Sequence, residues 1–106
     1  MGDWEARDPV AVMGAAEWRA FWEVRGMREL QLLLWAGWDP IGAVSPAEYD
    51  GHALRLATLL GSRASRSAIA AELGRIRRDE LGLEPSQAED SRAAEKIAAW
   101  FEAAAA

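Results

Sequence analysis

The chain has 106 residues, which is enough for a single domain with one small hydrophobic core. It contains no cysteine, so disulfides and thiolate chemistry are excluded, and its net charge of −5 disfavours general binding to polyanions. The apolar runs fall short of the roughly 20 residues that a membrane-spanning helix needs, and the acidic first residues do not form a secretory signal. We therefore expect a cytoplasmic protein without membrane contact.

The first predicted helix begins at Asp8-Pro9, with aspartate as its N-cap and proline in its first turn. Gly26 is a predicted weak point at its end. Trp18 and Trp22 flank the apolar side of this helix. Because so small a core accommodates few large rings, we predict that these two tryptophans contact another protein or, in a homodimer, a second copy of the chain.

The segment 27–37 is apolar on nearly every side, which is typical of a central, buried helix. Asp39-Pro40 repeats the cap-and-proline pattern and is expected to end it. Ser45-Pro46-Ala47-Glu48 then combines an N-cap serine, proline in the first turn and a glutamate that completes a capping box. We expect the helix that follows to run to about Leu60. Its predicted buried residues are Tyr49, Ala53, Leu56 and Leu60.

Ser65 is predicted to cap a further helix whose end is marked by Gly82 and whose core residues are Ile69, Leu73 and Ile76. Ser86 or Asp90-Ser91 caps a last helix, with an apolar face of Ala93, Ala94, Ile97, Trp100 and Phe101. No stretch alternates with the period of a strand. We predict an all-α fold, a compact bundle of four to five short helices in a single domain. Its expected parts are an N-terminal helical extension (1–26), a helical bundle domain (27–102) and a frayed tail (103–106).

Two motifs stand out in the middle of the chain: Trp38-Asp39-Pro40-Ile41-Gly42 and the acidic-Tyr-acidic triplet Glu48-Tyr49-Asp50. Together with Asp79-Glu80-Leu81-Gly82-Leu83, they resemble a family of small bacterial proteins that includes the YugE-type domain of unknown function. The resemblance implies a small all-α fold and brings no established activity. The family commonly has an acidic residue where this chain has Ala47 and an aromatic near the position of His52, so no metal or catalytic role is carried onto these two.

The matched region begins at Met27, where proteins of this family often start. Either translation starts at Met27, or the first 26 residues form a real additional helix. Three large aromatic residues within five positions are unusual in an untranslated leader, which favours the second interpretation.

Ligand-type side chains cluster at Asp39, Glu48, Asp50 and His52. Glu48 and His52 lie one helical turn apart, a spacing that can hold a divalent metal. Helix capping explains Asp39 and Glu48 better than a metal does, and Asp50 in a first turn interacts favourably with the helix dipole. With one histidine and no glycine-rich phosphate loop, we predict no catalytic residue, no metal, no cofactor and no enzyme activity.

The leading hypothesis is a non-enzymatic protein-interaction module that presents an acidic, aromatic corner to a protein partner, as an inhibitor, immunity or adaptor protein does. The predicted contact residues are Trp38, Asp39, Glu48, Tyr49 and Asp50 at the corner, with Trp18 and Trp22. We expect the Trp38 ring to pack inward with its N–H on a carbonyl or on Asp39. We place Trp35 and Trp100 in the core.

Two alternative functions belong to other classes of protein. Residues 52–78 contain six arginines and one glutamate, a net charge of +5 against −10 for the remainder, which could indicate weak nucleic-acid binding. The arginines would be Arg63, Arg66, Arg75, Arg77 and Arg78. The last four do not align on one helix face, so nucleic-acid binding is the weaker prediction. The other alternative is a metal-dependent hydrolase at the carboxylate cluster.

Overall fold

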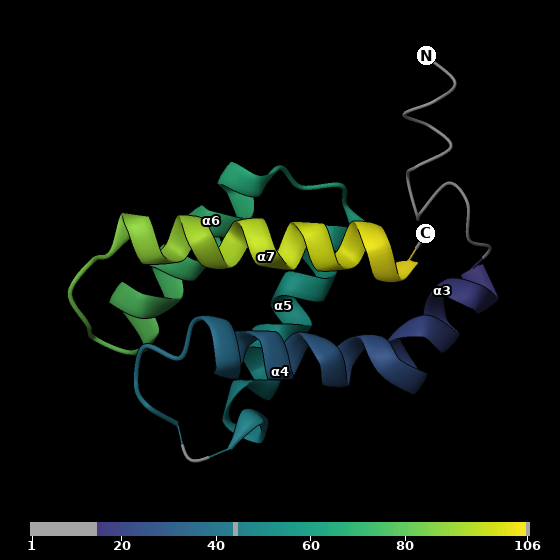
Figure 1. Ribbon diagram of the computed structural model, residues 1–106, viewed down its shortest axis with the longest axis horizontal. Helices are drawn as coiled ribbons and strands as arrows, with labels where there is room; N and C mark the ends of the chain where they lie inside the picture. The colour runs from purple at the N-terminus through teal and green to yellow at the C-terminus, as the bar shows by residue number, and fades with distance from the viewer. Residues whose placement is uncertain (1–14, 44, 106) are drawn as a thin grey trace.

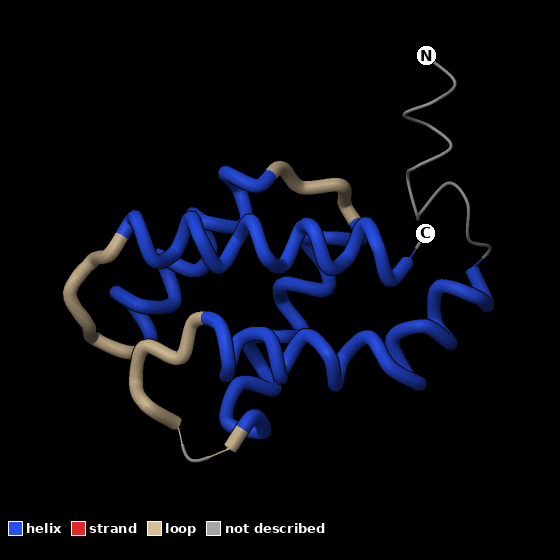
Figure 2. The backbone as a smooth tube through the Cα atoms, viewed as in Figure 1, coloured by secondary structure: helices blue, strands red, loops and turns tan. Residues whose placement is uncertain are grey.

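The computed structural model describes residues 15–43 and 45–105, and within them the fold is all-α (Figure 2). Four helical rods follow one another in this part of the chain (Figure 1). The first consists of α3 (Ala15–Phe21), a π-type turn η1 (Trp22–Gly26) and α4 (Met27–Gly37), and the second of a 3-10 turn η2 (Pro46–Tyr49) and α5 (Asp50–Gly61). The third joins α6 (Arg66–Arg75) to a second π-type turn η3 (Ile76–Glu80), and the fourth is α7 (Gln87–Ala105).

The rods surround one core. Helix α7 packs along α6 and also contacts α4, while α5 crosses between the α4 and α6 sides of the molecule (Figure 1). All four rods contribute buried side chains, which confirms the predicted single-domain bundle. The largest fully buried side chains are Leu30, Leu34, Tyr49, Leu56, Ile69, Leu73, Ile76 and Ile97. None of the described helices is long and apolar enough to cross a membrane.

The capping signals at Ser45 and Ser65 are confirmed. Ser45 and Glu48 form both halves of a capping box at the start of η2, and the Ser65 side chain accepts a hydrogen bond from the backbone N–H of Ala68 at 3.1 Å. The predicted buried set of the second rod, Tyr49, Ala53, Leu56 and Leu60, is buried throughout. Local rules sufficed here because a cap needs only residues that are neighbours in the sequence.

At Gly26 the π-type turn η1 ends and α4 begins, so the predicted weak point is a change of helix type and not a break in the rod. The Phe21 and Trp22 rings lie directly against the Gly26 backbone. A Cβ placed there would be 2.6 Å from Phe21 Cε2 and 2.8 Å from Trp22 Cε3. Glycine is therefore required at this position by close packing. The predicted helix start at Asp8-Pro9 lies outside the described residues.

Two tryptophans that the sequence predicts to be in the core are less buried than expected. Trp35 is 36% exposed, and Trp100 is only partly buried. Trp18 and Trp22 are instead packed against the core, where Trp22 stacks on Phe101 with 5.9 Å between ring centroids. At the other end of the chain, α7 is helical to Ala105. Fraying of that tail in solution stays a prediction.

Candidate functional site

The corner after α4 is built around the Trp38 indole. Trp38 terminates α4, where its backbone N–H still donates to the Leu34 carbonyl at 3.1 Å. Its side chain is 8% exposed, so the ring packs inward as predicted. The indole N–H does not meet Asp39 or a carbonyl. It donates to Asp90 Oδ1 of α7 at 2.8 Å, across 52 positions of sequence.

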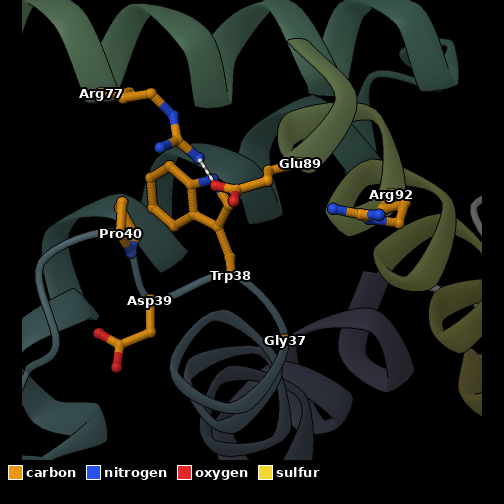
Figure 3. A pocket seen from close by; sticks show the side chains of 7 residues that line it. All are labelled: Gly37, Trp38, Asp39, Pro40, Arg77, Glu89 and Arg92. Atoms are coloured by element: carbon orange, nitrogen blue, oxygen red, sulfur yellow. Dashed lines mark hydrogen bonds and ion pairs between the residues drawn. The ribbon is translucent and has the colours of Figure 1, made fainter. Parts of the chain in front are cut away.

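Asp90 Oδ1 is the acceptor for two elements at once. Besides the Trp38 N–H, it receives Arg77 Nε at 3.1 Å and Arg77 Nη2 at 2.8 Å. Asp90 and Arg77 are 4% and 5% exposed. The Arg77 guanidinium also lies over the Trp38 ring, 5.7 Å from its centroid, and reaches Glu89 at 3.2 Å (Figure 3). A buried ion pair is tolerated when further hydrogen bonds compensate for the lost water, and here the Trp38 N–H donates to Asp90 and Glu89 accepts from Arg77.

Asp39 fixes the loop from the other side. Its φ of 33° lies in the left-handed region that aspartate tolerates better than most residues. Asp39 Oδ1 accepts the Ala43 backbone N–H at 2.7 Å and the Tyr49 hydroxyl at 2.5 Å. Its predicted role as a helix N-cap is wrong, because the residues after it form a turn and no helix. Burial raises the pKa of Tyr49, and the hydrogen bond to Asp39 raises it further.

These two anchors leave a small open pocket of about 340 Å³ between the end of α4 and the start of α7. Trp38 and Arg77 form its back, and Glu89 and Arg92 of α7 form one side (Figure 3). The Asp39 carboxylate points away from Trp38 (Figure 3). No part of the described structure groups three His, Cys, Asp or Glu side chains in a way that could hold a metal ion.

The predicted contact residues at the corner divide into two groups. Trp38 and Tyr49 are buried, in agreement with their expected inward packing, so their rings do not form an exposed surface, and their part in partner contact stays a prediction. Glu48 and Asp50 are exposed, and Asp39 is half-buried.

Two apolar side chains that are not among the predicted contact residues stand exposed near them. Ile41 is 46% exposed and Trp35 is 36% exposed, and the Trp35 N–H is tied to the Ala43 carbonyl at 2.8 Å. We call the exposed set the corner surface: Trp35, Asp39, Ile41, Glu48 and Asp50.

Sequence reasoning missed Arg77 and Asp90, although both carry a signal. Asp90 precedes Ile97 by two helical turns, at the N-terminal end of the apolar face of α7, and Arg77 follows the buried Leu73 by one turn. A charged residue on an apolar face indicates a buried pair when a second one of opposite charge exists. Asp90 was instead interpreted as a helix cap.

The arginines proposed for nucleic acid are largely engaged with carboxylates. Arg77 is buried on Asp90, and Arg75 binds Glu72 and Glu80. Arg66 pairs with Glu95 and Glu102, and Arg78 pairs with Asp79. A phosphate-binding surface needs cations that face solvent with free donors, and this arrangement does not supply a stripe of them.

No family model, no curated protein and no solved structure matches this chain. The resemblance to the YugE-type domain stays a prediction.

Proposed function

We propose that this chain is a non-enzymatic protein-interaction module of the cytoplasm that binds a protein partner through the corner surface. The observation that carries the proposal is the exposure of Trp35, in the last turn of α4, and of Ile41, in the loop that follows. The loop is held at its start by Trp38 on Asp90 and by Asp39 on Tyr49, and at Ala43 by hydrogen bonds with Trp35 and Asp39. A rigid loop loses little conformational entropy on binding, so it presents its apolar residues at low cost.

The chemistry of the corner surface indicates the kind of partner. An indole and an isoleucine supply an apolar centre, and the exposed carboxylates of Glu48 and Asp50 supply a negative rim. Interfaces commonly combine an apolar centre rich in tryptophan with a charged rim. The partner that fits is therefore a protein with an apolar pocket bordered by lysine or arginine. An inhibitor, immunity or adaptor role agrees with such a surface, and so does membership of the YugE-type family.

The test compares capture of proteins from the source organism by three immobilised forms: the native chain, the Trp35→Ala/Ile41→Ser variant, and Val24→Ser. Val24 is 79% exposed in η1 and controls for loss of an exposed apolar side chain elsewhere. We expect one partner to be retained by the native chain and the control and lost from the double variant. Glu48→Gln/Asp50→Asn should weaken the same complex and reduce its salt dependence. Equal recovery on all forms, or nothing above background, argues against the proposal.

A further inference from the structure

An apolar groove lies on a different part of the molecule, between the first rod and α5. It has a volume of about 410 Å³ and a floor made by Trp18, Trp22, Met27 and Leu54. Leu54 is 61% exposed there, although it lies in the middle of α5. The Trp22 N–H is buried and has no acceptor among the described residues. An apolar hollow of this size with an exposed leucine is typical of a contact site.

The rim of the groove carries one residue of each charge. Arg19 of α3 and Glu23 of η1 both line it, are both exposed, and lie four positions apart on the same rod. Neither side chain has an ion-pair partner in the described part of the structure, whereas the next arginine, Arg25, is paired with Glu29 at 2.9 Å. The arginine and the glutamate on this rim can therefore each pair with the opposite charge on the rim of a second copy of the chain.

We infer that this groove is the contact surface of a symmetric homodimer in which the first rods of two copies lie antiparallel. A two-fold axis between positions 19 and 23 places Arg19 of each copy opposite Glu23 of the other, since a two-fold interface pairs each residue with a different one on the partner. It also brings Leu54 and the two indoles of each copy against the groove of the other. The inference is independent of the corner surface.

The first experiment measures self-association by sedimentation velocity over a wide concentration range. We expect the native chain to change from monomer to dimer as concentration rises, and Leu54→Glu to remain monomeric because it buries a charge in the contact. Leu32→Glu is the matched control, since Leu32 is an exposed leucine (42%) outside the groove. The control should associate like the native chain. A monomeric native chain at every concentration, or a dimer that Leu54→Glu does not weaken, overturns the inference.

The second experiment exploits the symmetry. Arg19→Glu and Glu23→Arg, each alone, place like charges opposite each other twice, and we expect each to weaken self-association about ten-fold. A mixture of the two single variants restores both opposite-charge pairs between unlike chains, so it should form a heterodimer at least as tight as the native homodimer. The Arg19→Glu/Glu23→Arg variant should also regain native association. Single variants that associate normally, or a mixture no tighter than either variant alone, overturns the antiparallel pairing. Circular dichroism of each variant checks that the monomer remains folded.

Discussion

At the scale of single residues, the corner depends on which oxygen each buried donor can reach. Asp90 Oδ1 serves the indole of Trp38 and the guanidinium of Arg77, while Asp39 Oδ1 serves the hydroxyl of Tyr49. Each of these donors is buried, so each loses water on folding and needs its carboxylate as a replacement. The corner is therefore a structural anchor beneath the corner surface.

Removing the acceptor tests this interpretation. Asp90→Ala leaves the buried Arg77 charge without its main partner, and we expect a loss of about 3–5 kcal/mol in the free energy of unfolding. Glu89→Ala is the control: it also contacts Arg77, but its side chain is 53% exposed, and the expected loss is below about 1 kcal/mol. Urea unfolding at neutral pH measures both. Similar losses for the two variants would show that burial does not determine how much each carboxylate paired with Arg77 contributes to the free energy of unfolding.

Trp38→Ala removes the ring itself. The side chain is 8% exposed and packs against both Arg77 and Tyr49. We expect a loss of about 3–5 kcal/mol, the usual range for a buried aromatic truncated to alanine. Trp35→Ala should cost much less, because that ring is 36% exposed. Thermal unfolding of the two variants under the same conditions provides the comparison, and a larger loss for Trp35→Ala would contradict the assigned burial.

Tyr49 gives a prediction on the alkaline side. It is the chain's single tyrosine, so tyrosinate absorbance reports on it alone. Burial, and then the hydrogen bond to the Asp39 carboxylate, raises its pKa above the ordinary value of 10.0. The folded state keeps the proton that the unfolded state releases, so the stabilising contribution is complete below about pH 10 and is lost as the pH rises toward the folded pKa.

We therefore expect the tyrosinate signal to appear together with loss of helix in circular dichroism. Asp39→Asn removes the charge and should move the titration to lower pH. A signal that develops near pH 10 while the helices remain intact would show that Tyr49 is accessible in the folded chain.

At the scale of elements, the first rod shows how packing overrides helix propensity. Alanine normally exceeds glycine in a helix by about 1 kcal/mol. At Gly26 the Phe21 and Trp22 rings occupy the space of a side chain, and both rings are themselves held by the aromatic cluster around Phe101. The π-type turn lets the rod pass this point with the rings folded back onto it.

Gly26→Ala should therefore destabilise the chain by roughly 1–3 kcal/mol, the typical cost of overpacking. Gly51→Ala is the matched substitution, since nothing lies within 4 Å of its added Cβ and Gly51 is within α5. It should raise stability by about 0.5–1 kcal/mol. Opposite signs in thermal unfolding confirm the packing explanation, and a stabilising Gly26→Ala refutes it.

At the scale of the whole molecule, a chain of ion pairs joins three elements. Glu72 of α6 accepts Arg75 from its own helix and Arg55 from α5, and Arg75 continues to Glu80 of η3. Hydrogen bonding to Arg75, and its charge with that of Arg55, hold the pKa of Glu72 below the ordinary value of 4.5. A depressed carboxyl pKa stabilises the fold above the unfolded value, and this contribution disappears as the pH falls through the folded one.

Stability should accordingly decline as the pH falls below about 4.5, and part of the decline should depend on Glu72. In urea unfolding over a pH series, the Glu72→Gln variant is expected to show a flatter acid limb than the native chain. The exposed pair Arg78 and Asp79 provides the control, because an exposed pair contributes little. An acid limb unchanged by Glu72→Gln would place the acid sensitivity elsewhere.

The sequence by itself determined the all-α class, the helix boundaries at Ser45 and Ser65, and the buried faces of α5, α6 and α7. Caps and helical periodicity depend on residues within a few positions of one another, so they can be predicted from the sequence alone. The inward direction of the Trp38 ring was also predictable, because a large apolar ring at the end of an apolar helix has its core beside it.

Only the tertiary structure decided what each ring and charge contacts. Trp38 meets Asp90 and Arg77 because α4, η3 and α7 converge at the corner, and Trp22 joins the core because α7 brings Phe101 to it. These partners are far apart in sequence, and their pairing follows from how the rods pack. The packing of the rods also left Trp35 and Ile41 exposed, although Trp35 lies on a helix that is apolar on nearly every side.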